Sequence, residues 1–419
     1  MLAAVLAAIL AALLVAAVLV GLAPWGAADA PSSAPAAAAT AFAPPATPST
    51  GPAPADPARQ RERRRLLEAV REAERTYCSY RAASRYPPGA RPMAENADQA
   101  RPNDPVVSTG AMRLDGEGSD DRVRLQASQS RVYLGAGEAV TFTLRAVDED
   151  GRTLPLAVSS AFAQGVTQAG TPEAGRVALA FADDGAGAGA AAATATAAAA
   201  ASAADTVADD GTFTAVLAPG QGVLARFDGT IRAEVRYAVG GRAGIVQFDV
   251  IHTPDLPAAW TGRVRAALEA GALDFYLGLD VRRAGRYVVS GRVDDAHGQP
   301  FALLTFDEVL DAGPAEVKLA LFGRLVRDGR PALPLTLRDV EGYLLKEDGD
   351  PDRIMLPRLQ GRVAASVQQD AAGFSTAEWQ SEERSRYLAE FARDVARARA
   401  GLAAVDPAAP PPPAACVAP

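Results

Sequence analysis

The chain has 419 residues and a formal net charge of −8, from 42 basic and 50 acidic residues. This acidic balance gives no basis for a nucleic-acid partner, because proteins bind nucleic acid through surplus positive charge. The length allows two domains of about 100–150 residues with flanking segments. The two cysteines, Cys78 and Cys416, are too few for a disulfide framework, so we expect the domains to depend on their hydrophobic cores.

The chain begins with an apolar segment. Residues 2–23 contain no charged side chain, and as a helix rising about 1.5 Å per residue they are long enough to cross a hydrocarbon layer of about 30 Å. We expect an uncleaved membrane anchor that places the rest of the chain outside the cytoplasm. A cleaved signal peptide with a small-residue site at Ala28-Asp29-Ala30 is one alternative. A buried helix of a soluble protein is the other.

A stalk and a helix are expected next. Residues 25–56 are rich in Ala, Pro, Ser and Thr, a composition typical of a disordered stalk. Asp56-Pro57 then favours a helix start, with a helix expected from Ala58 to about Tyr77. Residues 59–75 carry seven arginines and four glutamates. A solvated helix with internal ion pairs is the simpler interpretation, and contact with anionic lipid headgroups is the alternative.

A proline-rich stretch spans residues 86–105. Its prolines favour an extended backbone, which in other proteins docks in aromatic grooves of a partner. We expect this stretch to pack along the protein's own β structure.

From Arg122 onward the hydrophobic period is two, which indicates β-strands. Gly240-Gly241 is expected to join two strands as a hairpin. The strands expected in this first module are 122–126, 139–147, 176–182, 212–218, 230–239 and 244–251. Strands at this spacing, with no helical pattern between them, favour an Ig-like sandwich.

A second β module is expected after the linker 253–257. Seven strands are expected in it, over 260–269, 272–281, 286–293, 301–306, 316–322, 335–345 and 358–367. A final helix should begin at Ser375, where Glu378 completes a capping box. Its apolar stripe is expected to pack on the second sandwich and consists of Trp379, Tyr387, Leu388, Phe391 and Val395.

The fold class is therefore mainly β, with two Ig-like or fibronectin-like sandwich modules. The expected domains are a membrane anchor or signal over 1–24, a stalk over 25–56, a helix with an extended segment over 57–117, a first sandwich over 118–253 with an Ala-rich loop at 186–208, a second sandwich over 254–370, an amphipathic helix over 371–402 and a disordered tail over 403–419.

The sequence offers little catalytic chemistry. His252 and His297 are the only histidines and are expected in loops. There is no Gly-x-Ser-x-Gly elbow and no His-Glu-x-x-His zinc motif. We therefore expect a protein that is not an enzyme.

Acidic turns are the one recurring polar feature. Calcium is held by six to eight oxygen ligands, which clustered carboxylates and turn carbonyls provide. The best candidate ligands are Asp183, Asp184, Asp209 and Asp210. Ordinary turn chemistry explains the same residues without any metal, so no cofactor is required.

Two stretches resemble a known group of proteins. Phe181-Ala-Asp-Asp-Gly185 followed by Ala208-Asp-Asp-Gly-Thr-Phe-Thr-Ala215 resembles the acidic-turn signature of Ig-like modules in bacterial exported proteins of the choice-of-anchor X type. The run 285–295, followed by Gly298-Gln-Pro300, is similar to a strand pair of the same proteins. The resemblance spans about residues 120–367 and implies display in the periplasm or on the cell surface, without implying a reaction.

We therefore expect a membrane-anchored or exported envelope protein that binds another envelope protein or a polysaccharide through its sandwiches. An accessory subunit of an envelope secretion or enzyme assembly is the alternative. The second sandwich is the expected contact surface.

Overall fold

The computed structural model describes residues 56–167, 172–183, 208–346, 353–366 and 370–407, with residues 414 and 416. It divides into two units, residues 1–60 and 61–419. The predicted anchor over 1–24 lies outside the described residues, as do almost all of the stalk and Ala-rich loop, and most of the tail. In the part of the chain that is described, no helix is both long and apolar enough to span a membrane.

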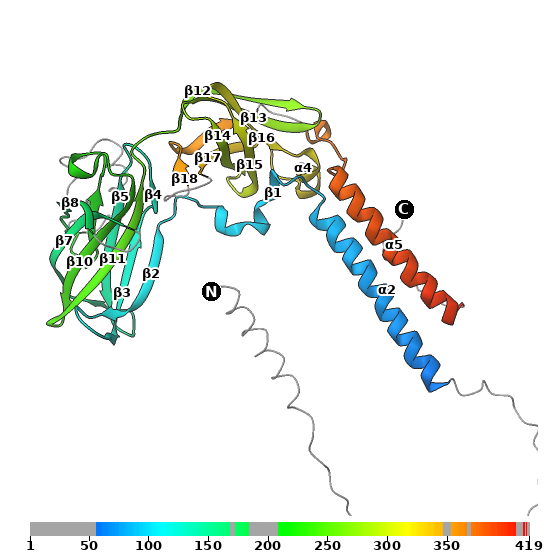
Figure 1. Ribbon diagram of the computed structural model, residues 1–419, viewed down its shortest axis with the longest axis horizontal. Coiled ribbons are helices and arrows are strands. Elements are labelled where there is room, and N and C mark those ends of the chain that lie inside the picture. The colour runs from blue at the N-terminus through cyan, green and yellow to red at the C-terminus, as the bar shows by residue number, and fades with distance from the viewer. Residues whose placement is uncertain are drawn as a thin grey trace, which may run out of the picture. The chain divides into compact units, whose positions relative to one another are not determined.

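The first sandwich has two sheets (Figure 1). One sheet has the order β2 (Val106–Arg113), β3 (Ser119–Gln129), β5 (Val140–Val147) and β6 (Thr153–Leu154), with β9 (Phe213–Leu217) also paired to β5. The other has the order β4 (Tyr133–Leu134), β11 (Arg242–His252), β10 (Gly229–Val239), β7 (Leu156–Val166) and β8 (Pro172–Ala178).

Alternating burial explains why these strands form two layers. On β10 every second side chain from Ile231 to Val239 is buried, while the residues between them are partly exposed. Phe142 on β5 and Phe248 on β11 meet across the layers with ring centroids 4.7 Å apart. The predicted hairpin at Gly240-Gly241 is confirmed, because both glycines have positive φ and join β10 to β11.

The second sandwich has a large and a small sheet. The large one has the order β1 (Ala90–Pro92), β15 (Pro300–Leu310), β14 (Gly285–Asp294), β17 (Thr336–Leu345) and β18 (Arg353–Met355), with β19 (Leu359–Ala365) also paired to β17. The small one has the order β12 (Ala258–Glu269), β13 (Ala272–Val281) and β16 (Gly313–Leu321), and a short helix, α4 (Gly323–Gly329), follows it. A shared core of buried residues such as Phe275, Val289 and Leu337 joins the two sheets.

The proline-rich stretch contributes to this second sandwich. It forms β1, which pairs antiparallel with β15, and short 3₁₀ turns at Met93–Glu95 and Ala97–Gln99. The buried guanidinium of Arg292 donates through Nε to the Gln99 carbonyl at 2.9 Å. Packing of the stretch on the protein's own β structure is therefore confirmed.

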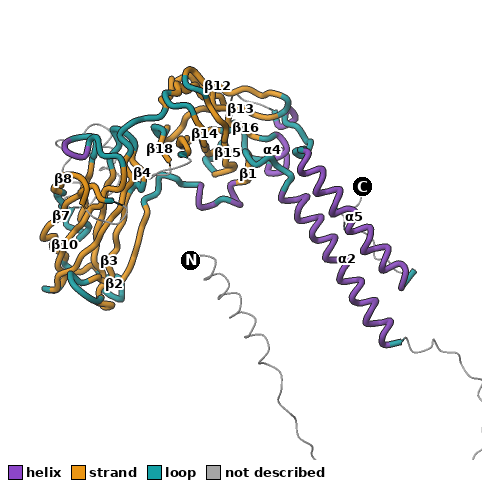
Figure 2. The backbone as a smooth tube through the Cα atoms, viewed as in Figure 1, coloured by secondary structure: helices purple, strands orange, loops and turns teal. Residues whose placement is uncertain are grey.

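Two long helices lie side by side, as Figure 2 shows. α2 (Pro57–Ala83) and α5 (Glu382–Val405) run antiparallel, because Tyr80 near the end of α2 meets Phe391 of α5, whereas Glu74 pairs with Arg399 further along α5. Asp56 caps α2 as expected, since its carboxylate accepts from the Ala58 amide at 2.9 Å. Tyr387 and Phe391 of the apolar stripe thus pack on Tyr80 of α2, which corrects the expectation that they pack on the second sandwich.

The start of the last helix also differs from the prediction. Ser375 accepts from the Ala377 amide at 3.2 Å in a local turn, whereas Ser381 caps α5 by accepting from Arg384 at 3.0 Å. Glu378 does not close a capping box and instead pairs with the buried Arg384. Ser and Thr side chains bond nearby amides in turns as readily as at helix starts, so the sequence motif was ambiguous.

One disulfide is present where the sequence reading relied on hydrophobic cores alone. Cys78 of α2 is bonded to Cys416, with their Cα atoms 5.7 Å apart, and Arg81 donates to the Cys416 carbonyl at 2.7 Å. The bridge joins α2 to the chain segment that follows α5, and it lies outside both sandwiches. It was not foreseen because 338 positions separate the cysteines, and only the pairing of α2 with α5 brings those chain segments together.

Candidate functional site

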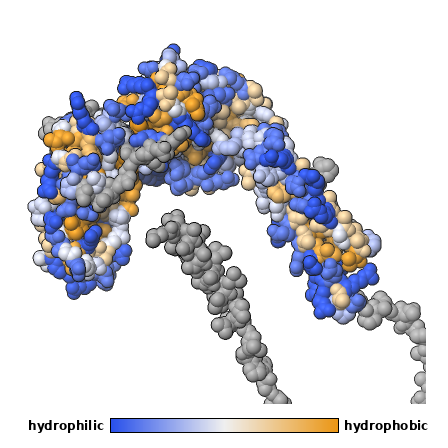
Figure 3. Space-filling model, viewed as in Figure 1, coloured by the Kyte–Doolittle hydropathy of each residue, from blue (hydrophilic) through white to orange (hydrophobic). Residues whose placement is uncertain are grey.

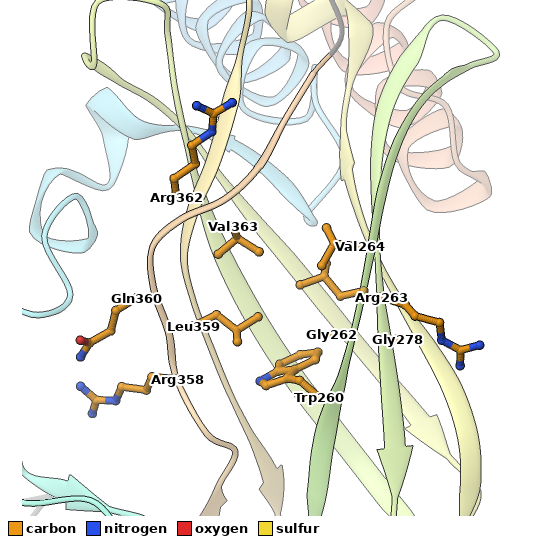
Figure 4. A pocket seen from close by; sticks show the side chains of 11 residues that line it. Trp260, Gly262, Arg263, Val264, Gly278, Arg358, Leu359, Gln360, Arg362 and Val363 are labelled. Atoms are coloured by element: carbon orange, nitrogen blue, oxygen red, sulfur yellow. The ribbon is translucent and has the colours of Figure 1, made fainter. Parts of the chain in front are cut away.

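A groove opens along one edge of the second sandwich, between β12 of the small sheet and β19 of the large one. Its volume is about 350 Å³, within the range of about 300–1,000 Å³ that small-molecule sites occupy. Figure 4 shows Trp260 and Val264 from β12 pointing toward Leu359 and Val363 from β19. These four side chains form the apolar floor of the groove.

Trp260 holds the two edges together at one end. Its indole Nε1 donates to the Pro357 carbonyl at 2.7 Å, and the ring also packs against the core of the sandwich. A buried indole N–H needs an acceptor, so this bond fixes the ring plane beside Leu359. The floor is consequently preformed.

Both edges of the groove carry a bulge. On β12, Trp260 pairs with Leu279 and Val264 with Leu277, so residues 261–263 oppose Gly278 alone. A side chain at Gly278 would collide with the Thr261 hydroxyl, which explains the glycine. On β19 the register shifts around Gly361, whose amide donates to Asp339 at 2.8 Å. Gly262 and Gly361 both have positive φ, of 77° and 68°, which a glycine adopts without steric cost.

Arginines flank the apolar floor. Arg263 lies on the β12 side, and Arg358 and Arg362 on the β19 side, all extending away from the floor in Figure 4. Among the described residues, Arg263 has only the Thr261 hydroxyl at 3.4 Å, and Arg362 forms no ion pair. By contrast, Arg265 is paired with Glu316 at 3.1 Å.

Arg358 is the most enclosed of the three. Its Nε is buried and lacks a hydrogen-bond partner within the described part of the chain. Burial lowers the pKa of the Arg358 guanidinium from its usual value, although the group stays charged at any physiological pH. The flank of the groove thus holds positive charge, and Arg263 and Arg362 form no ion pair with a described residue.

The face of the molecule that Figure 3 shows is largely hydrophilic. In the face shown in Figure 3, hydrophilic residues cover much of both sandwiches and interrupt the hydrophobic areas. Val264 is one of the large apolar residues that stay exposed, at 39%. A second hollow of about 240 Å³ shares Arg263, Val264 and Gly278 with the groove and continues across β12 to Tyr276.

A larger hollow, of about 430 Å³, lies among Tyr86, Pro88 and Trp379 where the proline-rich stretch meets the last segment before α5. Arg91 and Glu95 both line it, so its charges balance. It therefore offers less to a charged ligand than the groove does.

The predicted calcium ligands are partly brought together. The Asp183 carboxylate accepts from the amides of Asp210 at 3.2 Å and Gly211 at 2.9 Å, and Asp210 accepts from the Thr212 amide at 2.8 Å. Asp209 lies in the same turn with φ of 58°, and Asp184 lies outside the described residues. Within the residues that are described, no cluster of three His, Cys, Asp or Glu side chains is arranged to hold a metal. The carboxylates thus serve the turns, and calcium binding stays a prediction.

The two histidines have different surroundings. His297 is exposed in a turn, as expected. His252 is only 1% exposed at the end of β11, where Nδ1 lies 2.7 Å from the Phe227 carbonyl. Burial lowers the pKa of the His252 imidazole. The loop expected at His252 is thus a buried strand end.

The sequence does not predict the groove between β12 and β19. Gly-Arg-Val occurs on both of its edges, at 262–264 and 361–363, and each copy supplies the bulge glycine, a flanking arginine and a floor valine. The same tripeptide also stands at 175–177 and at 291–293, where Arg292 is fully buried. The pattern was therefore visible, but only the pairing of strands distinguishes the two copies that line the groove.

No protein-family model and no curated protein matches the chain. Among solved structures, a DUF4785 family protein from Legionella pneumophila aligns over 60% of this chain and 58% of its own, at 12% identity and a TM-score of 0.33. The adhesin InvE of Yersinia pseudotuberculosis aligns over 54% of this chain and 57% of its own, at 14% identity and a TM-score of 0.14. The Escherichia coli adhesin FdeC aligns over 56% of this chain and 64% of its own, at 13% identity and a TM-score of 0.18. The chain spans less than two thirds of each solved protein, and likeness at this level carries no argument about function.

Proposed function

We propose that this protein is a non-enzymatic component of a bacterial cell envelope, held at the membrane by residues 2–23, and that its second sandwich binds an envelope partner. The observation that carries the proposal is the groove between β12 and β19, with its preformed apolar floor and with Arg263 and Arg362 at its sides, which form no ion pair with the residues that the structure describes. A site that is concave, apolar at its centre and charged at its sides is typical of ligand binding.

The disulfide supports an exported location. Disulfides persist in oxidising compartments such as the periplasm and are rare in the cytosol. The bridge between Cys78 and Cys416 is therefore consistent with an anchor or signal at residues 2–23 that exports the body of the chain. Under this proposal both sandwiches are Ig-like modules that display a binding surface outside the cytoplasm, as the resemblance to choice-of-anchor X proteins implies.

The test is site-specific photocrosslinking in intact cells. A benzophenone side chain at Gln360, an exposed groove residue, is compared with one at Val309, which is 73% exposed on β15 in the same sheet. The proposal expects an adduct with an envelope component from position 360 and none from position 309. Adducts that do not differ between the two positions would contradict it. A single protein captured from position 360 in a one-to-one ratio with this chain would favour the accessory-subunit alternative.

A further inference from the structure

We infer that the groove of the second sandwich binds a linear acidic polysaccharide, whose carboxylates pair with Arg263 and Arg362 while its sugar rings pack on Trp260 and Leu359. This inference rests on the proposed function and names its ligand class. It draws on three features of the groove, which are the charge on its two sides, the form of its edges and its extent.

Charge points to an anionic ligand. The whole chain carries a net charge of −8, so its overall charge repels an anionic polymer. At the groove the balance is reversed locally, because Arg263 and Arg362 lie on opposite sides and form no ion pair with a described residue. Guanidinium groups bind carboxylates bidentately. A ligand that crosses the groove therefore meets a positive charge on each side.

The edges of the groove disfavour an extended peptide. A peptide that adds to a sheet needs a regular row of free backbone N–H and C=O groups on an edge strand. Both edges are interrupted by bulges, at residues 261–263 and around Gly361, and bulges are a known means of preventing strand addition. The bulges therefore favour recognition by side chains over strand addition, and a polysaccharide is recognised by side chains.

The floor and its extent suit a chain of sugar rings. Trp260 and Leu359 offer flat apolar surface on which the C–H faces of sugar rings pack, and the indole is held in place by its bond to Pro357. The adjoining hollow extends this surface across β12 toward Tyr276. Carboxylates that project from both sides of a linear uronic-acid chain would reach the arginines on either side.

The test measures binding of polygalacturonate to the full-length protein in neutral detergent, with dextran as the neutral polymer and poly-L-glutamate as the acidic peptide. The double variant R263Q/R362Q is compared with R124Q/R226Q, which removes two exposed arginines from the first sandwich. Because both pairs are exposed, the melting temperatures of the variants should match the wild type. We expect R263Q/R362Q to weaken polygalacturonate binding at least tenfold, R124Q/R226Q to change it less than twofold, and dextran not to bind.

Three results would overturn the inference. Equal losses in both double variants would mean non-specific charge attraction, and poly-L-glutamate binding as tightly would mean an acidic peptide ligand. Absence of polygalacturonate binding would also exclude the inferred ligand. In that last case, groove-specific crosslinking from Gln360 would leave the proposed function standing, whereas failure of both experiments would remove both.

Discussion

The largest buried polar side chain of the second sandwich, Arg292, is satisfied differently from Tyr237 and His252 of the first. In the second sandwich Arg292 is fully buried, yet it donates to the Gln99 carbonyl at 2.9 Å, the Asp339 carbonyl at 3.0 Å and the Glu341 carboxylate at 2.8 Å. In the first, the Tyr237 hydroxyl and the His252 Nε2 are buried without a hydrogen-bond partner in the described part of the chain. Burial raises the pKa of Tyr237 to about 12.

The difference follows from the chemistry of the groups. A guanidinium cannot lose its charge, so one that is fully buried, as Arg292 is, needs acceptors close by. Tyr237 and His252 can stay neutral and tolerate a missing partner at smaller cost. The second sandwich obtains its acceptors partly from residues 99 and 100, which precede the first sandwich in the chain, since Arg338 also donates to the Ala100 carbonyl at 2.9 Å. It is therefore completed by a distant segment, whereas no arginine is fully buried among the described residues of the first sandwich.

The largest effect is expected from breaking this network. Arg292→Met leaves Glu341 and two carbonyls without their donor, and we expect a loss of about 3–5 kcal/mol in the free energy of unfolding. Urea denaturation followed by far-UV circular dichroism measures it, because that signal reports the strands of both sandwiches. The control is Arg232→Gln, which removes an ion pair with Asp249 at the surface of the first sandwich and should cost less than about 1 kcal/mol. Similar losses in both variants would contradict the contrast.

Removal of the disulfide should come next. Cys416→Ser frees α2 from the end of the chain, and loss of a native disulfide costs about 2–5 kcal/mol. We expect the lower half of that range, because the aromatic contacts of Tyr80 with Tyr387 and Phe391 persist. Thiol titration of the denatured wild type should give no free thiol before reduction and two afterwards. Free thiols before reduction in a protein purified from the envelope would disprove the bridge.

A moderate effect is expected in the first sandwich from Asp183→Ala. The substitution leaves the amides of Asp210 and Gly211 without their acceptor, at a cost of about 1–3 kcal/mol. Asp150→Ala is the matched control, since Asp150 is exposed and pairs only with the exposed Arg152 at 3.3 Å. Thermal unfolding with and without calcium gives both readouts. If calcium binds here, it raises the melting temperature of the wild type and not that of the double variant Asp183→Ala/Asp210→Ala. A wild-type melting temperature that calcium does not change would contradict the calcium prediction.

The smallest effect is a pH dependence that belongs to the first sandwich. Because burial lowers the pKa of His252 in the folded state, the unfolded chain binds a proton first as the pH falls below about 6.5, and stability decreases. One proton limits the slope to about 1.4 kcal/mol per pH unit. Denaturation between pH 7.5 and 5 measures the slope of the unfolding free energy against pH. We expect this slope to be smaller in His252→Asn than in the wild type, and unchanged in His297→Asn, whose histidine is exposed. An unchanged slope in His252→Asn would contradict the assignment.

Local patterns foretold most strands but missed β7, which pairs with β10 and β8. Its sequence, Leu156-Ala-Val-Ser-Ser-Ala-Phe-Ala-Gln-Gly-Val166, contains small residues that do not alternate cleanly. β2 was likewise expected as part of an extended segment, yet it pairs with β3 and makes an edge of the first sandwich. Its residues 106–111 are exposed, so no hydrophobic period marked them. Strand partners, rather than intrinsic pattern, determine such segments.

The sequence by itself determined the features that depend on neighbours along the chain. These include the alternation in β10, the Gly240-Gly241 hairpin, the helix start at Asp56 and the absence of familiar catalytic motifs. The tertiary structure alone decided which distant residues meet. Trp260 faces Leu359, Arg292 reaches Gln99 and Cys78 joins Cys416, because these pairs are set by sheet order and helix packing, which no local period encodes.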